Sequence, residues 1–410
     1  MVASHAPSHL FPKLLTGAAL YAFFSFSLLA AMLDTDGMPL IQGKRTFLLG
    51  VYQLPNRPNA WQQAAAAGFQ LVHVPAKREE LDRAQKYGLR AWVTLGVIQP
   101  QTRTADQARI RRIVEDLRDH PALLFWETVD EPTYEWKKPG LKIPPEVVQE
   151  TYRFVKALDP QRPLYLNHAP TNLVATLQRY NPGGDFIATD IYPVIPHGIR
   201  EMYGLWPSGR QGDLLNTHIS QVGQYALKMR QVAGPHRAVL MVLQGFAWER
   251  LRAKGQDPRM ILEPTRDEQR FMAWQAVANG VNGILYWGLH TNPPASKLWD
   301  ELCSVARELS SLEQELAARP LNWTIELEYH DTGHSLDRGI EYLLKPSAAG
   351  PVLIAVNADP NPVEVTFRKL PKTSSIKVLF ESRSVVSQGD AFRDRFRPFD
   401  VHLYRLLPVR

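Results

Sequence analysis

Two acidic residues that could carry acid–base chemistry, Asp130 and Glu131, directly follow the apolar run Leu123–Val129. Carboxylates placed against a buried strand are costly to desolvate unless each finds a partner. A structural explanation is that Asp130 caps the turn and that Glu131 pairs with an arginine. The chemical explanation is proton donation, because burial and a neighbouring carboxylate raise the pKa of a glutamic acid toward neutral pH.

Four later apolar runs also end in polar or aromatic residues. A lone histidine in such a place is more often structural than functional. However, five strand ends that carry polar or aromatic residues, counting the one at Asp130 and Glu131, are hard to explain by packing alone. Hydroxyl-binding side chains and aromatic faces of this kind suit a sugar ring. The four later ends are Asn167-His168, Asp190-Ile-Tyr192-Pro193, Gln244-Gly-Phe-Ala-Trp248 and Tyr286-Trp287-Gly-Leu-His290.

Eight apolar runs, separated by amphipathic helical patterns, must position these residues. Their continuous apolar character is typical of parallel strands that are buried on both faces. Eight such strands predict an α/β fold, a (β/α)8 TIM barrel, in which active sites lie at the C-terminal ends of the strands. An open doubly wound sheet is the alternative, although no G-x-G-x-x-G motif opens a first helix. The runs are Phe47–Gln53, Phe69–Val74, Ala91–Val97, Leu123–Val129, Pro163–Asn167, Phe186–Val194, Ala238–Gln244 and Gly283–Trp287.

After a predicted helix over Lys297–Ala318, short strands follow one another without helices between them. Regular short strands separated by turn residues predict a small antiparallel β-sandwich. We therefore expect a barrel over residues 44–319 and a sandwich over 320–410, after an N-terminal segment, 1–36. The expected sandwich strands are Trp323–Tyr329, Gly339–Leu344, Val352–Val356, Val363–Phe367, Ile376–Leu379 and Val401–Leu406.

The segment Leu14–Leu33 holds twenty residues without a charge, with Lys13 before it and Asp34 after it. That length matches the hydrocarbon core of a bilayer. It predicts an export signal, either cleaved or kept as a single membrane anchor, with the barrel outside the cytoplasm in the periplasm, on the cell surface or secreted.

The composition excludes several classes of protein. Among 410 residues, 47 Lys and Arg against 41 Asp and Glu give a net charge of +6. The basic residues are scattered, whereas nucleic-acid binding needs them clustered on one face. Cys303 is the only cysteine, which excludes an intramolecular disulfide and a cysteine zinc site. The histidines lack metal-ligand spacing, and we expect neither a metal nor an organic cofactor.

With these residues in place, the chain resembles the clan A glycoside hydrolases, whose fourth strand ends in an Asn-Glu pair, usually followed by Pro. The resemblance extends to the Tyr192-Pro193 pair after strand six, Trp287 on strand eight and the terminal sandwich. It implies that Glu131 is the proton donor and that Asp130 contacts the sugar 2-hydroxyl. Trp287 would then be the platform on which the sugar ring stacks.

The chain departs from that clan at strand seven, where Gln244 stands in place of a nucleophilic Glu. An amide cannot form a glycosyl ester, so a second carboxylate must come from elsewhere. Asp190, on the expected inner face of strand six, is our prediction for a base or nucleophile. Glu263 in the loop after strand seven is the alternative, whereas Glu249 is expected to be solvated and Glu127 to form an ion pair inside the barrel.

The sequence thus predicts an exported glycoside hydrolase acting on an oligo- or polysaccharide. Glu131 and Asp190 would be catalytic, while Asp130, Asn167, Tyr192, Gln244, Trp287 and His290 would bind the sugar. Because Asp190 is expected across part of the barrel mouth, inversion with carboxyl groups about 6.5–9.5 Å apart is the more natural mechanism. The alternative function, favoured by Gln244, is a carbohydrate-binding barrel without catalytic activity at the cell surface.

Overall fold

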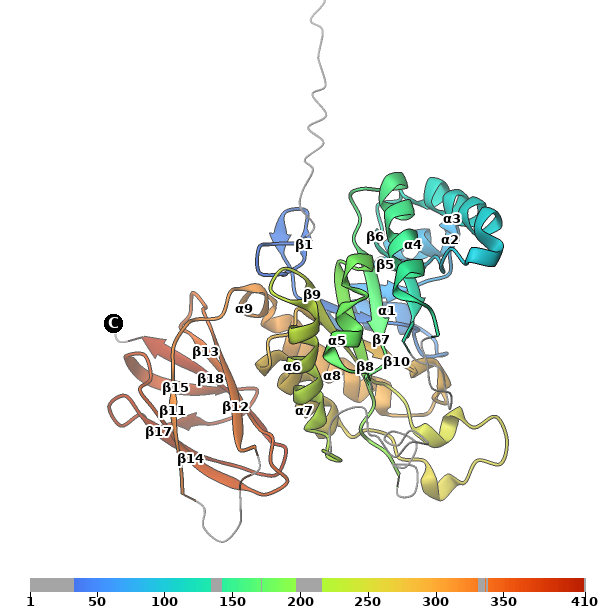
Figure 1. Cartoon of the computed structure of the whole chain (residues 1–410). Coiled ribbons are helices and arrows are strands. Elements are labelled where there is room, and N and C mark those ends of the chain that lie inside the picture. The colour runs from blue at the N-terminus through green and yellow to red at the C-terminus, as the bar shows by residue number, and fades with distance from the viewer. Residues whose placement is uncertain are drawn as a thin grey trace, which may run out of the picture.

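Eight parallel strands close into a barrel in the order β10-β3-β4-β5-β6-β7-β8-β9 (Figure 1). This computed structural model describes residues 33–133, 142–170, 172–196, 216–330, 336 and 338–408. All eight strands expected from the apolar runs are present, so the barrel prediction is confirmed. Their bounds are β3 Leu48–Val51, β4 Leu71–His73, β5 Arg90–Thr94, β6 Leu123–Asp130, β7 Leu164–His168, β8 Phe186–Ile191, β9 Ala238–Gln244 and β10 Gly283–Trp287.

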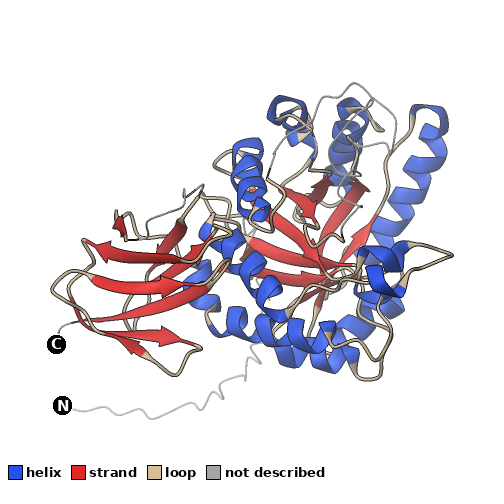
Figure 2. Cartoon of the chain, turned by 90° about the horizontal axis from the view of Figure 1, so that it is seen from below, coloured by secondary structure: helices blue, strands red, loops and turns tan. Residues whose placement is uncertain are grey.

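Helices surround the barrel strands on the outside, as Figure 2 shows. Thr265 and Glu268 form a capping box at the start of α7, with the backbone N–H of each residue donating to the side chain of the other. The predicted helix over Lys297–Ala318 is broken at Leu312 into α8 and α9. The helices are α1 Ala60–Ala67, α2 Arg78–Lys86, α3 Arg103–Leu117, α4 Pro145–Leu158, α5 Val174–Gln178, α6 Gln221–Ala233, α7 Arg266–Ala278, α8 Leu298–Ser311 and α9 Glu313–Ala317.

The barrel interior is packed with large side chains from alternate positions of the strands. Trp92, Phe125, Tyr165, Phe186 and Leu240 belong to one buried cluster there. Alternation along a strand sends every second residue inward, so the same parity that buries Phe186 also turns Asp190 toward the axis. The interior therefore forms an apolar floor beneath the polar residues at the strand ends.

Two antiparallel sheets follow the barrel and pack face to face as a sandwich. One has the order β11-β14-β17 and the other β12-β13-β18-β15-β16, around a shared apolar core. The two strands that the sequence did not predict are β16, which is only two residues long, and β17, whose FRDRF sequence has three charged residues in the middle. The bounds are β11 Glu326–Tyr329, β12 Ile340–Lys345, β13 Val352–Asn357, β14 Val363–Arg368, β15 Thr373–Leu379, β16 Ser384–Val385, β17 Phe392–Phe396 and β18 Val401–Pro408.

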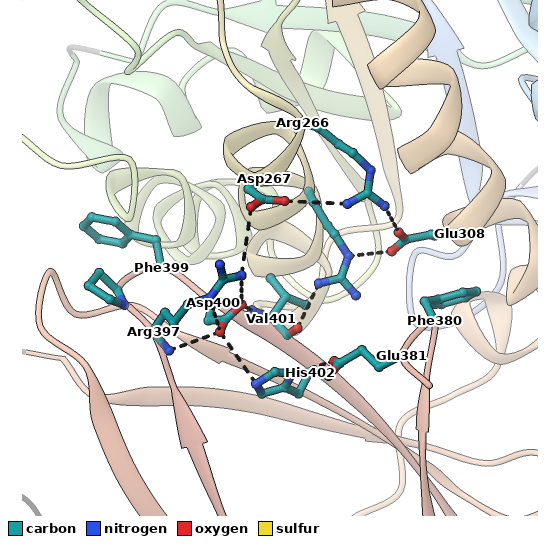
Figure 3. Close-up of a pocket in the computed structure, with 12 residues that line it drawn as sticks. Arg266, Asp267, Glu308, Phe380, Glu381, Arg397, Phe399, Asp400, Val401 and His402 are labelled. Carbon is teal, nitrogen blue, oxygen red and sulfur yellow. Dashed lines mark hydrogen bonds and ion pairs between the residues drawn. The ribbon is translucent and has the colours of Figure 1, made fainter. Parts of the chain in front are cut away.

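The sandwich packs against the barrel helices through an apolar layer and a polar seam. Ile354 and Leu403 of the sandwich belong to the same core cluster as α7 and α8 residues. In the seam, Glu308 accepts hydrogen bonds from Arg266 and from Arg270 (2.7 Å), and these residues line a cavity of about 580 Å³ (Figure 3). Its acidic and basic side chains pair with one another, so we regard this cavity as part of a structural interface.

The segment that precedes the barrel begins, where the structure describes it, at Leu33. The rest of the predicted export signal, Leu14 to Met32, lies outside the described residues. Within the part of the chain that is described, no helix is both long and apolar enough to cross a membrane. A short hairpin follows, formed by β1 (Leu40–Ile41) and β2 (Lys44–Arg45), and Arg45 pairs with Asp34 and Asp36.

Candidate active site

The end of β6 leaves regular strand geometry where the two acidic residues begin. The pairing of β6 with β7 shifts register between Glu127 and Asp130, which places Asp130 beside Asn167. Glu131 then adopts φ 45°, in the left-handed region that residues other than glycine rarely occupy, and its N–H donates to the carbonyl of Asn167 (3.1 Å). Irregular pairing and backbone strain of this kind are concentrated at functional sites, where they redirect side chains.

The carboxyl groups of Glu131 and Asp190 lie in direct hydrogen-bond contact with each other. Two carboxylates cannot share a hydrogen bond unless one of them carries a proton. Burial raises the pKa of Asp190 well above its ordinary value, and the charges of Glu131 and Asp130 raise it further. Burial, followed by the charge of Asp130, also raises the pKa of Glu131. Asp190 therefore keeps its proton at neutral pH, and the pKa of Glu131, raised to about 7, leaves a large share of the Glu131 side chains protonated as well.

This contact corrects two expectations about Asp190. A carboxyl group that keeps its proton is neither a base nor a nucleophile, and in this contact Asp190 is the hydrogen-bond donor to Glu131. The spacing of about 6.5–9.5 Å that an inverting pair requires is also absent, because hydrogen-bonded carboxyl groups leave no room for a water molecule and a sugar between them. The parity argument placed Asp190 on the correct face of β8 but did not give its distance from β6.

The side chain of Asn167, on β7, links the carboxyl groups of Asp130 and Asp190. Its Nδ2 donates to Oδ1 of Asp130 (2.9 Å) and, more weakly, to Oδ1 of Asp190 (3.3 Å). Its own Oδ1 is buried and has no hydrogen-bond partner. Asp130 is exposed in the barrel mouth. Protein atoms nevertheless surround it on most sides, and this partial desolvation raises its pKa. Of these groups, the exposed Asp130 is the one that a ligand in the mouth can reach.

Glu127 lies one layer deeper in the barrel and is almost completely buried. Its Oε2 accepts from Thr94 Oγ1 (2.7 Å) and Trp92 Nε1 (3.2 Å). Burial raises the pKa of Glu127 to about 7 and lowers that of His73, 3.9 Å away, to about 4. The expected ion pair is therefore wrong, because neutral donors hold this carboxyl group and His73 is uncharged at neutral pH.

Aromatic side chains form one wall of the barrel mouth. Tyr192 stacks on Trp287, with ring centroids 5.7 Å apart and planes at 26°, and Trp248 packs against the edge of Tyr192. His290 is exposed, 5.9 Å from the Trp287 ring, and partial burial lowers its pKa. Trp287 is half-buried, so part of its ring is accessible to a ligand. The structure thus brings Tyr192, Trp287 and His290 together, as their positions at strand ends predicted.

Gln244, in contrast, is fully buried and its side chain is occupied by backbone groups. Its Oε1 accepts from the N–H of Val194 (2.9 Å), and its Nε2 donates to the carbonyls of Val194 (2.9 Å) and Phe246 (3.0 Å). The predicted substrate-binding role is therefore replaced by a structural one. Gln244 fastens the loop after β8 to the end of β9, a role that strand parity could not reveal.

The remaining candidates near β9 also have partners. Glu263 pairs with Arg250 (2.7 Å) and accepts from Ser296 (2.9 Å), and Glu249 is buried against Arg252 rather than solvated. His168 lies on the helix-facing side of β7, where burial lowers its pKa to about 3. In the described part of the chain, no group of three or more His, Cys, Asp or Glu residues is arranged to hold a metal ion.

The sequence matches no protein-family model and no curated protein. Solved structures do share the fold, and those named here are glycoside hydrolases. An alpha-amylase from Geobacillus thermoleovorans, complexed with acarbose, superimposes with a TM-score of 0.56 and 10% identity over 90% of this chain and 100% of that chain. An Anoxybacillus alpha-amylase gives 0.55 and 10%, over 86% and 90%. A family 30 xylanase from Clostridium acetobutylicum gives 0.50 and 12%, over 88% and 96%. The expected likeness to glycoside hydrolase barrels is thus confirmed for the fold.

Proposed function

We propose that this protein is a glycoside hydrolase in which Glu131 donates a proton to the leaving oxygen. The place of Glu131 at the strand ends, in contact with the protonated Asp190, carries this proposal, because burial and the charge of Asp130 raise the pKa of Glu131 to about 7 and so keep a proton on it near neutral pH. A general acid works best when its pKa lies near the operating pH. The fold of the similar structures agrees with this activity, but a barrel alone does not imply a reaction.

Each residue around the acid has a separate task in this proposal. Asp190 donates to Glu131 and holds it in place, while Asn167 fixes Asp130 and Asp190 on either side. The half-buried Trp287 offers a face on which a sugar ring can stack, and such an aromatic contact contributes about 1 kcal/mol. A sugar seated against this wall would lie over the apolar floor of the barrel, next to the pair of carboxyl groups.

The test is hydrolysis of a panel of aryl glycosides and polysaccharides by the wild type and by Glu131→Gln. The amide keeps the shape of the side chain but cannot supply the proton, so we expect the rate on natural glycosides to fall by about 10²–10⁴. Glu263→Gln is the matched control, because it removes a carboxylate that is held by Arg250 away from the pair. Equal losses in the two variants, or no loss in Glu131→Gln, would contradict the proposal.

A carbohydrate-binding barrel without catalysis is the second candidate. It is favoured by the close contact of Glu131 with Asp190 and by the occupied side chain of Gln244, because neither of these two positions then offers a second carboxylate at catalytic spacing. In that case no glycoside of the panel would be cleaved, but glycans would still bind. Trp287→Ala would weaken this binding about 5–10-fold, the value of a lost stacking contact.

We further propose that the N-terminal segment directs export. Asp34 contributes to the fold through Arg45 and Arg319, so the folded part extends at least to that residue. A chain that begins at Leu33 should fold and stay in the cytoplasm, whereas the full chain should be found outside it. Cytoplasmic accumulation of the full chain would contradict the export proposal.

A further inference from the structure

Another cavity between the barrel and the sandwich has a volume of about 300 Å³. Pockets that bind small ligands begin at about this size. The loop after β8, the chain before α6, the start of α7 and the turn between β17 and β18 form its walls. It adjoins the cavity of Figure 3, because Asp267, Pro398 and Phe399 line both. The lining residues that matter below are Val194, Ile195, His218, Asp267 and Phe399.

The side chains of this cavity combine ring faces with a hydrogen-bond acceptor. The exposed His218 and the half-buried Phe399 contact each other, with ring centroids 5.7 Å apart and planes at 40°. The Asp267 carboxylate is exposed, and its ion pairs with Arg266 (3.6 Å) and Arg397 (3.9 Å) are too long to be hydrogen bonds. A sugar presents C–H groups on the faces of its ring and hydroxyl groups around its edge, so it matches both features.

Phe399 is held in an unfavourable backbone conformation at the edge of the cavity. Its φ of 52° lies in the left-handed region. Its N–H donates to the carbonyl of Asp359 (3.3 Å), and its ring packs against Phe271 of α7, with centroids 5.4 Å apart. Such strain persists only where the surrounding structure holds it, and it is concentrated at sites that bind ligands. The turn of the sandwich thus presents an aromatic ring to the barrel.

One loop forms a wall of the active-site mouth and a wall of this cavity. Tyr192 stacks on Trp287 in the mouth, and Val194 and Ile195 line the cavity. An extended chain spans at most about 3.6 Å per residue, so the Cα atoms of Tyr192 and Val194 are at most about 7 Å apart. Gln244 fixes this loop through the N–H and the carbonyl of Val194 (2.9 Å each). A short glycan can bridge the distance from the mouth to the cavity.

We infer that this cavity binds a further sugar unit of the glycan whose scissile bond lies in the mouth. The inference rests on the proposed function and deepens it, because it gives the sandwich a part in binding an oligo- or polysaccharide. The sugar would pack against His218 and Phe399, and Asp267 would accept hydrogen bonds from its hydroxyl groups. Since this contact lies away from the reacting bond, it stabilises the bound substrate and the transition state equally and lowers KM rather than raising kcat.

The experiment measures affinity as a function of chain length. Dissociation constants are determined by calorimetry for maltose-, cellulose- and xylan-derived oligosaccharides, from disaccharide to hexasaccharide. For the series that binds, we expect His218→Ala and Phe399→Ala to weaken the longer members about 5–10-fold and to leave kcat/KM on aryl monosaccharides unchanged. His218→Ala is the variant that leaves the core intact, because His218 is exposed whereas Phe399 packs on Phe271.

The matched control is Phe380→Ala. Phe380 is also a sandwich phenylalanine with a left-handed backbone (φ 63°), and it is 47% exposed. It lines the cavity of Figure 3 but not this one, so its replacement should change none of these affinities.

The outcomes separate the inference from the proposed function. Unchanged affinity of His218→Ala and Phe399→Ala across the whole series, or an equal loss in Phe380→Ala, would overturn the inference. An equal loss of kcat/KM on aryl monosaccharides would also overturn it, because the residues would then act in the mouth. Cleavage of aryl glycosides without binding of any oligosaccharide would overturn the inference and leave hydrolysis standing. Binding of long oligosaccharides that depends on His218, without cleavage of any glycoside, would overturn the proposed function and leave the sugar site standing.

Discussion

Replacing Asp130 by asparagine should lower the pKa of Glu131. Burial is the main cause of the raised pKa of Glu131, and the negative charge of Asp130 is the next. Asparagine keeps an oxygen that can accept from Asn167, but it removes the charge. Because a nearby anion disfavours ionisation of a carboxyl group, its removal makes Glu131 ionise at lower pH. In the pH profile of the hydrolysis rate, the decrease that follows loss of the Glu131 proton should therefore occur at lower pH in the variant.

The size of this effect follows from the position of Asp130. Two unit charges about 4 Å apart interact by about 1 kcal/mol in water and by about 4 kcal/mol near a protein surface. Asp130 is exposed in the mouth, so a value of about 1–2 kcal/mol is appropriate, which corresponds to about 0.7–1.5 pH units.

Carbon NMR of carboxyl-labelled glutamate gives the pKa of Glu131 directly, without the need for a substrate. The control is Asp257→Asn, which removes the same charge from an exposed site paired with Arg259. It should leave the titration of Glu131 unchanged. A pKa in Asp130→Asn that rises, or moves by less than about 0.2 units, would refute the electrostatic reasoning.

Three further predictions concern stability. Burial raises the pKa of Glu127 from 4.5 to about 7, so its contribution is fully present below pH 4.5 and is lost as the pH rises through 7. The free energy of unfolding of Glu127→Gln, measured in urea, should therefore rise by about 2.5 kcal/mol relative to that of the wild type between pH 5 and pH 8, and a constant difference would contradict this. Gln244→Glu places a carboxylate against the carbonyls of Val194 and Phe246. We expect this repulsion to lower the free energy of unfolding by about 3 kcal/mol without raising the rate of hydrolysis. A variant that is as stable as wild type and hydrolyses faster would show that this position is catalytic. Glu308→Gln weakens the ion pairs with Arg266 and Arg270 and should lower the free energy of unfolding, measured by thermal unfolding, by about 2 kcal/mol. A change of less than about 0.5 kcal/mol would mean that this seam contributes little to stability.

The barrel was predictable because a parallel strand that is buried on both faces consists of a continuous run of apolar residues. Strands such as Ala238–Gln244 contain nothing but apolar residues until their last position. In the sandwich, Phe392–Phe396 was missed for the opposite reason, since Arg393, Asp394 and Arg395 occupy its middle. The hydrophobic pattern therefore predicted a strand only where burial restricts its residues to apolar types.

The candidate site was predictable as a set of strand ends but not as a geometry. Glu131, Asp190 and Asn167 do meet, because they end neighbouring strands β6, β8 and β7. The register shift before Asp130 and the left-handed backbone at Glu131 decide how close the carboxyl groups come, and neither has a sequence signature. Gln244 was misread because the loop that occupies its amide is far away in the sequence.

Proton donation by Glu131 can be measured through the dependence of the hydrolysis rate on the leaving group. For wild type and Glu131→Gln, kcat/KM is measured on a series of aryl glycosides whose phenols span acidic to weakly acidic leaving groups. We expect a shallow dependence for wild type and a steep one for the variant, with nearly equal rates for the most acidic phenols, which need no proton. Parallel dependences with a constant difference between the two proteins would contradict the assignment of Glu131 as the acid.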